Sequence, residues 1–177
     1  MNGNKITLPG LIVKTSIIHT VTYFIMGLLA STFLNYAGKF ADSSMACWMR
    51  QTDDIIVMIG PLFQPIRGII FALAFFPLRE IVFGKKNGWL VLWWTLVALG
   101  ILSTFGPPPG SVEGLIYTVI PLSIQLPGLL EVIPQAFLLS AILYFWVNHP
   151  EKKWMNWVMG ILFFVLVSFP ILGLLVR

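Results

Sequence analysis

Long apolar runs constrain this sequence more than any other feature. The last run, about residues 155–176, contains no charged side chain, and a helix needs roughly 20 apolar residues to cross the hydrocarbon core of a bilayer. Hydrophobic residues make up 58% of the 177 residues and charged residues only 10%. A soluble domain of this size would expose large apolar patches and aggregate. The sequence therefore predicts an integral membrane protein in contact with a lipid bilayer.

The predicted fold is all-α, a polytopic transmembrane helix bundle formed by a single integral membrane domain, residues 1–177. We expect five spans, at about residues 11–34, 55–78, 89–105, 126–147 and 155–176.

One further apolar segment, about residues 115–125, is too short for a span of its own. Pro121, Pro127 and Gly128 separate it from the fourth span, because proline disrupts a helix interior. We expect this segment to form a re-entrant or interfacial half-helix. A break at membrane depth is tolerated only where protein or a wet cavity surrounds it.

The distribution of basic residues predicts the orientation. Five spans place two groups of Lys and Arg residues on opposite sides of the membrane. The larger group comprises Lys5, Lys14, Arg79, Lys85, Lys86, Lys152 and Lys153, and the smaller comprises Lys39, Arg50 and Arg177. Because cytoplasmic loops carry the excess of basic residues, we expect a multi-pass protein of a cytoplasmic-type cell membrane, with its N-terminus inside and its C-terminus outside.

The second span carries Gln64 and Arg67 near its middle. Its Leu, Ile, Val and Phe residues contribute about −4 to −8 kcal/mol to insertion, against roughly +3 kcal/mol for a central Arg. The span can therefore insert, but Arg67 needs a partner inside the bundle.

The fourth span offers partners for these side chains. Glu131 and Gln135 are spaced i,i+4 and share one helix face. If both spans start on the outer side, Glu131 lies about 8 Å deep, Gln135 about 14 Å and Arg67 about 18 Å. An Arg side chain can extend several ångströms towards an interface, so we expect Arg67 to reach Glu131. Two interpretations stay open: a ligand site in an outward-facing polar cavity, or an ion pair that fixes helix packing.

Three further sets of polar residues have simpler interpretations. We expect Glu113 and Gln125 at the rim of the cavity, and Arg79, Lys85 and Lys86 as interfacial anchors that bind lipid phosphate. The first span carries a polar stripe at helical spacing, which predicts a face that packs against another helix. The stripe comprises Ser16, Thr20, Tyr23, Gly27 and Ser31, and His19 beside it is expected to form a hydrogen bond across helices.

Several function classes find no support in the sequence. The motifs HExxH and GxSxG and a phosphate-binding glycine loop are absent. Cys47 is the only cysteine, so an intrachain disulfide or a cysteine-based metal site cannot form. We expect no metal and no cofactor. The basic residues are scattered at the ends of apolar runs, which argues against a nucleic-acid partner.

The sequence therefore predicts a small membrane protein without chemistry of its own. It would bind or transport a small solute, or act as a subunit of a membrane assembly with a protein partner or as a homo-oligomer. The alternative is an intramembrane enzyme that acts on a lipid-like substrate, with Glu131 as acid or base and Arg67 stabilising an anion.

Overall fold

The computed structural model describes residues 6–175, and every regular element in that range is helical. The all-α prediction is confirmed. Three helical segments are long and apolar enough to cross a membrane: Leu8–Phe33, Leu122–Asn148 and Trp154–Gly173. Two shorter apolar segments, Gly60–Phe75 and Gly88–Leu102, accompany them.

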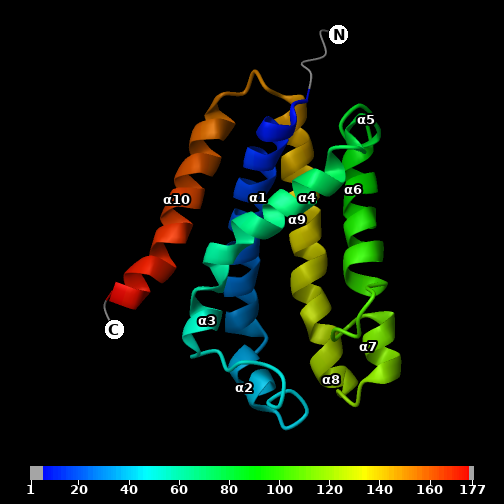
Figure 1. Ribbon diagram of the computed structural model, residues 1–177, viewed down its shortest axis with the longest axis vertical. Helices are drawn as coiled ribbons and strands as arrows, with labels where there is room; N and C mark the ends of the chain where they lie inside the picture. The colour runs from blue at the N-terminus through cyan, green and yellow to red at the C-terminus, as the bar shows by residue number, and fades with distance from the viewer. Residues whose placement is uncertain (1–5, 176–177) are drawn as a thin grey trace.

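Helix α1 (Leu8–Phe33) is the central element (Figure 1), and α4, α9 and α10 all pack against it. Thr7 caps its N-terminus by accepting a hydrogen bond from the Gly10 backbone N–H at 3.4 Å. Its 26 residues give a length of about 39 Å. The chain leaves α1 through Asn35, whose φ of 49° turns it into the short helix α2 (Tyr36–Ala41).

The expected span at residues 55–78 is not one continuous helix. It consists of α3 (Ile55–Met58), a 3-10 turn (Gly60–Phe63) and α4 (Gln64–Phe75). Pro61 and Pro65 each stand at the start of a helical piece, where a missing backbone N–H costs nothing. These two prolines divide the segment. In Figure 1, α4 crosses α1 and α9 obliquely and leads to α5 (Arg79–Val82).

The third apolar segment combines α6 (Gly88–Val97) with one turn of π-helix, η2 (Ala98–Leu102). This pair replaces the predicted span at residues 89–105, and α6 packs against α9 (Leu129–Asn148). A π-helical turn leaves backbone groups in an irregular register and often occurs at functional sites.

The predicted half-helix at residues 115–125 is also divided. Helix α7 (Val112–Tyr117) ends where Thr118 becomes extended, and α8 (Leu122–Gln125) begins after extended Pro121. A 3-10 turn, Leu126–Gly128, then leads directly into α9. Because Pro121 cannot continue a helix from the preceding residues, the segment forms two short pieces instead of one half-helix.

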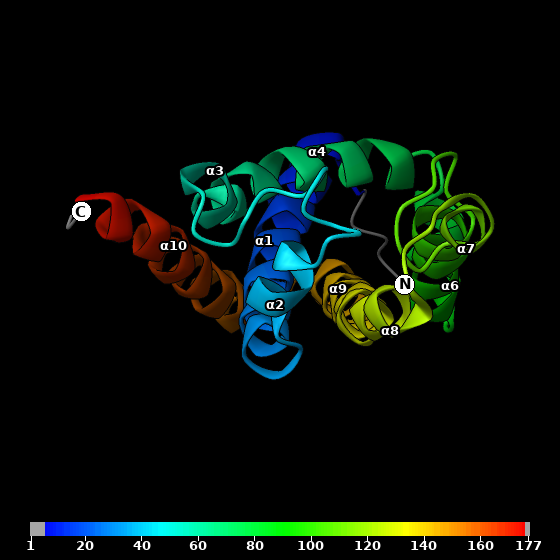
Figure 2. The ribbon, with the colours of Figure 1, turned by 90° about the horizontal axis from the view of Figure 1, so that it is seen from below.

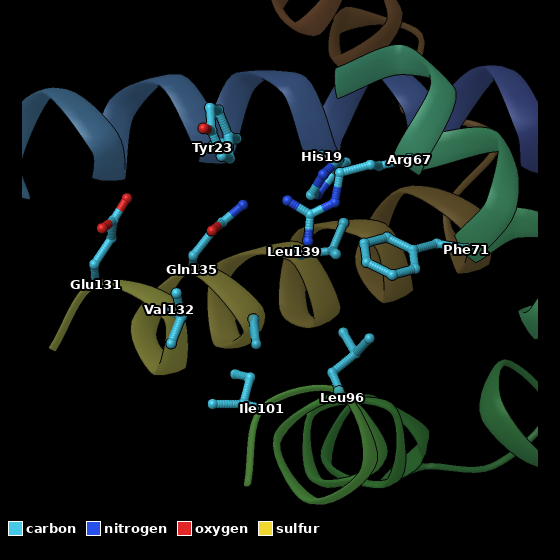
Figure 3. Close-up of a pocket in the computed structure, with 12 residues that line it drawn as sticks. His19, Tyr23, Arg67, Phe71, Leu96, Ile101, Glu131, Val132, Gln135 and Leu139 are labelled. Carbon is cyan, nitrogen blue, oxygen red and sulfur yellow. The ribbon is translucent and has the colours of Figure 1, made fainter. Parts of the chain in front are cut away.

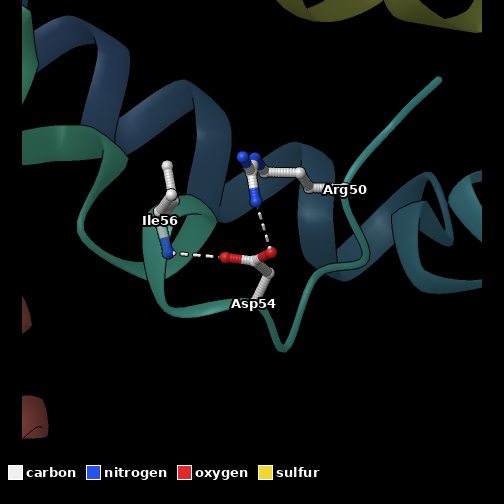
Figure 4. A network of polar contacts seen from close by, with 3 residues as sticks. All are labelled: Arg50, Asp54 and Ile56. Carbon is white, nitrogen blue, oxygen red and sulfur yellow. Dashed lines mark hydrogen bonds and ion pairs between the residues drawn. The ribbon is translucent and has the colours of Figure 1, made fainter.

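The chain alternates between two ends of the molecule (Figure 1). The start of α1, the turn around α5 and the loop between α9 and α10 (Trp154–Leu175) lie at one end. The loops around α2 and around α7 and α8 lie at the other. In the loop before α3, Asp54 accepts hydrogen bonds from the Ile56 backbone N–H at 2.8 Å and from Arg50 at 3.0 Å (Figure 4). These bonds fix the entry into α3.

Helices α1 and α4 approach each other very closely. A Cβ atom placed on Gly68 would lie 2.3 Å from the Cα atom of Ser16, and the Ser16 hydroxyl donates to the Pro65 carbonyl at 3.2 Å. This contact confirms that part of the polar stripe on α1 packs against another helix. The Ser31 end of the stripe does not: Ser31 is exposed and donates to the Leu28 carbonyl of its own helix.

Helix α10 stands apart from the rest of the bundle (Figure 2). At its start, Met155 and Met159 are buried, and Asn156 accepts a hydrogen bond from Trp146 at 2.8 Å. Beyond this region most of its large side chains are exposed, among them Trp157, Ile161 and Phe164. α10 is therefore most deeply buried in its first turns, and further along it contacts α1 through Phe169, whose ring centre lies 6.4 Å from that of Phe24.

Candidate functional site

A pocket of about 220 Å³ opens between α1, α4, α9 and the segment formed by α6 and η2 (Figure 3). Its walls are largely apolar and include Phe71, Leu96, Ile101 and Leu139. Five polar side chains also line it: His19, Tyr23, Arg67, Glu131 and Gln135. Three of the four residues expected to form a polar cluster, Arg67, Glu131 and Gln135, thus share one pocket.

The guanidinium group of Arg67 points into this pocket, in the region between His19 and Leu139 (Figure 3). Arg67 is an exposed residue, so the pocket is open to the surface. The guanidinium carbon lies 5.8 Å from the centre of the Phe71 ring, a distance at which a cation–π attraction operates. The Phe71 ring therefore lies close to the positive charge of Arg67.

The expected ion pair between Arg67 and Glu131 does not form. Among residues 6–175, the ion pairs are Arg50–Asp54 at 3.0 Å and Arg79–Glu80 at 3.7 Å. In Figure 3, Gln135 lies between Arg67 and Glu131 along α9. Without this contact, an Arg67–Glu131 ion pair cannot fix the packing of the helices.

Glu131 has a different partner. The Tyr36 hydroxyl, from α2, donates a hydrogen bond to its carboxylate, and a Cβ atom on Gly27 would lie 3.7 Å from the carboxylate oxygen. Burial raises the pKa of the Tyr36 phenol, and its bond to Glu131 raises it further. Tyr36 is therefore a neutral donor that orients the carboxylate without cancelling its charge.

Gln64 does not line the pocket; it supports the pocket from behind. Its side-chain oxygen lies 3.2 Å from Nε2 of His19, and its amide nitrogen donates to the Gly60 carbonyl at 3.2 Å. With the amide oriented in this way, the oxygen accepts a hydrogen bond from Nε2–H, so Nδ1 is the unprotonated ring nitrogen of a neutral His19. The expected hydrogen bond of His19 across helices is confirmed. Nδ1 is buried without a partner in the described part of the chain.

Gln135 lines the pocket with an amide group that can bind a ligand. Its side chain is 9% exposed, it lines the pocket (Figure 3), and no hydrogen bond of its amide group is found within residues 6–175. The amide atoms of Gln135 are not among the fully buried polar atoms without a partner in the described chain, so they face the open space of the pocket. The amide of Gln135 is thus available to a molecule in the pocket.

The two residues expected at the rim lie elsewhere. Gln125 is 2% exposed and holds the preceding loop together: it accepts from the Gly110 backbone N–H at 3.2 Å and donates to the Ile120 carbonyl at 2.7 Å. Glu113 is half-buried in the first turn of α7. Neither residue is among those that line the pocket. Pro-rich loops need such internal hydrogen bonds because their backbone groups lack helical partners.

The three expected lipid anchors lie together near the end that carries α5. Arg79 stacks on Phe76 with 4.4 Å between the guanidinium carbon and the ring centre, and it donates to the Phe76 carbonyl at 3.0 Å. Lys85 and Lys86 have exposed side chains, and their backbone carbonyls accept hydrogen bonds from Tyr144 at 2.9 and 3.1 Å. Their binding of lipid phosphate stays a prediction.

Sequence reasoning missed that His19, Tyr23 and Phe71 line the pocket. Tyr23 belongs to the polar stripe of α1, for which the sequence predicts a packing face, and His19 lies beside that stripe. The signal that could have placed them is helical spacing: Gly27, which contacts Glu131, and Tyr23 and His19 follow one another at intervals of one turn.

Within residues 6–175, no group of three or more His, Cys, Asp or Glu side chains is arranged to hold a metal ion. The chain matches no protein family model, no curated protein and no solved structure. The class of protein is therefore defined by its own features: an all-α chain with three helices able to span a membrane and a polar pocket lined by α1, α4, α9 and the segment of α6 and η2.

Proposed function

We propose that this chain is a small integral membrane protein that binds a small solute in the pocket between α1, α4, α6 and α9. It would transport this solute across a cytoplasmic-type cell membrane, or present it as a subunit of a membrane assembly. The observation that carries the proposal is an open pocket in which Arg67 has no carboxylate partner within residues 6–175, and in which the Gln135 amide faces the pocket without a hydrogen bond in that range. Polar groups inside apolar walls are typical of solute sites.

We further propose five passes through the bilayer, with the N-terminus inside and the C-terminus outside. The alternating course of the chain supports this topology (Figure 1). The end that carries α5 and the loop between α9 and α10 holds Arg79, Lys85, Lys86, Lys152 and Lys153, whereas the described part of the opposite end holds Lys39 and Arg50. The excess of basic residues would face the cytoplasm. Lys5 and Arg177 lie outside the described residues.

Broken helices support the solute-binding role. Helical segments 55–75 and 112–128 are interrupted by proline, and η2 adds an irregular turn beside the pocket. Transporters commonly build their sites from such discontinuous helices. The intramembrane enzyme stays the alternative prediction.

Ligand-dependent stability tests the proposal. The purified protein in mild detergent would be screened with small anionic, cationic, zwitterionic and neutral solutes, and the thermal unfolding midpoint would be measured. A solute at 100 times its Kd stabilises the folded state by about 2.7 kcal/mol. Arg67→Ala should remove this stabilisation and leave the protein folded. Arg79→Ala, which removes a guanidinium group outside the pocket, is the matched control and should retain it.

Stabilisation that persists in Arg67→Ala, or no stabilisation by any solute, would contradict a solute site at this pocket. Native mass spectrometry of the same preparation separates the two roles that remain. A protein partner that co-purifies in a fixed ratio would identify a subunit of an assembly, whereas a chain that binds solute alone would favour transport.

A further inference from the structure

The pocket contains two opposite charges that do not neutralise each other. Arg67 and Glu131 both line it, and the ion pairs of the described chain involve neither residue. Glu131 is held by the neutral Tyr36 hydroxyl, and Arg67 faces the Phe71 ring. A charge in a low-dielectric environment is costly unless it is paired. The pocket therefore offers Arg67 as a partner for an anionic group and Glu131 as a partner for a cationic group.

We propose that the pocket binds a zwitterion, with its anionic group on Arg67 and Gln135 and its cationic group on Glu131. This inference rests on the proposed solute-binding function and names the class of solute. A simple anion would leave Glu131 unpaired, a simple cation would leave Arg67 unpaired, and a neutral solute would satisfy neither charge. The apolar walls contact the chain that joins the two charged groups.

The positions of the charges limit the length of the ligand. The Glu131 carboxylate lies 3.7 Å from where a Cβ atom on Gly27 would stand, whereas Arg67 points into the pocket beside His19 (Figure 3). Gly27 and His19 are eight residues apart on α1, which corresponds to about 12 Å along the helix axis. The two charges are thus on the order of 10 Å apart, and a charge-assisted hydrogen bond at each end occupies about 3 Å. A gap of about 4 Å remains for the ligand.

This gap suits charged groups joined by a short methylene chain, as in β-alanine or γ-aminobutyrate, and it exceeds the charge separation of free glycine. A phosphoethanolamine headgroup has a comparable separation between its ammonium and phosphate groups. The shared chemistry is a primary ammonium group and an oxyanion separated by a few bonds. The source is either a water-soluble ω-amino acid or a zwitterionic lipid.

The expected result is strict charge recognition. Isothermal titration of the full chain in detergent should show that γ-aminobutyrate or β-alanine binds at least about tenfold more tightly than butyrate or butylamine, because hydrogen bonds between charged groups are the strong ones. Glycine and ε-aminohexanoate should bind more weakly than the intermediate lengths. A short-chain phosphatidylethanolamine, titrated in parallel, forms the lipid arm. Binding in either arm supports the proposal and identifies the source.

Two variants assign the ends. Glu131→Gln keeps an acceptor for Tyr36 and should weaken the zwitterion about tenfold while leaving butyrate affinity unchanged. Arg67→Gln should also weaken the binding of the zwitterion about tenfold, but it should leave the affinity for butylamine unchanged. Arg79→Gln is the matched control without effect. If butyrate or butylamine binds as tightly as the zwitterions, the zwitterion proposal is overturned, but the solute site stands. If no compound in either arm binds, the zwitterion proposal is overturned, and the solute site then depends on the thermal screen with the wider set of solutes.

Discussion

Helices α1 and α10 have similar lengths, 26 and 22 residues, but they differ in polar content and have opposite surroundings. α1 buries Thr15, His19, Thr20 and Thr22 among its apolar residues and packs against α4, α9 and α10. α10 is apolar almost throughout and is held near its first turns by Met155 and Met159. Lipid tails are as apolar as leucine, so apolar side chains alone do not bring helices together in a membrane. Small and polar groups on α1 supply the specific contacts.

The largest effect is expected from replacing a glycine at the crossing of α1 and α4, compared with replacing a glycine on α10. Gly68→Val should prevent α1 and α4 from packing, because a Cβ atom there lies 2.3 Å from the Cα of Ser16. We expect loss of most folded protein, measured as monodisperse material by size-exclusion chromatography. Gly160→Val in α10, where nothing lies within 4 Å of a Cβ atom, is the control. Equal yields of the two variants would contradict the close crossing.

Truncating one leucine in the core of the bundle and one on α10 should separate core packing from lipid contact. Leu143 on α9 is fully buried, whereas Leu172 on α10 is 55% exposed. Leu143→Ala should cost about 2–5 kcal/mol, through lost contacts and a cavity. Leu172→Ala should cost less than about 1 kcal/mol, because it only exchanges side-chain contacts for lipid contacts. Reversible unfolding in mixed micelles measures both values, and similar costs would mean that α10 packs as α9 does.

Removing a polar contact should also affect the two regions differently. Gln64→Leu leaves Nε2 of His19 without its partner, so we expect a loss of about 1–3 kcal/mol of unfolding free energy. The double variant Gln64→Leu/His19→Phe should recover part of this loss, because apolar replacement of both partners can be nearly neutral. Ser168→Ala in α10 removes only a bond to Phe164 of the same helix and should cost little. No recovery in the double variant would argue against a direct contact.

The smallest effect should come from the loop that connects α1 to α3. Hydrogen bonds from the Ile56 backbone and from Arg50 lower the pKa of the Asp54 carboxyl group. Its contribution to stability is therefore complete above the ordinary pKa of Asp and is lost as the pH falls through the lowered folded-state pKa. Asp54→Asn should lower the thermal midpoint slightly at pH 7, and this difference should disappear in acid. A difference independent of pH would exclude ionisation of Asp54 as its cause.

Composition and periodicity were sufficient to predict an all-helical chain with membrane-length segments. They also placed Arg67, Glu131 and Gln135 near one another, because a helix rise of 1.5 Å per residue gives comparable depths for segments that start on the same side. Length and hydropathy are properties of the chain itself, so these conclusions required no tertiary contact.

The tertiary structure decided which polar groups pair. Pro61 and Pro65 divide the second apolar segment and turn α4 obliquely across α1, so Gln64 binds His19 and Arg67 misses Glu131. Tyr36 then takes the place expected for Arg67, and Gln125 turns inward to hold its own loop. The donor–acceptor distance of a hydrogen bond can vary by only a few tenths of an ångström. A depth calculation along straight helices cannot reach that precision, because one proline shifts every side chain that follows it.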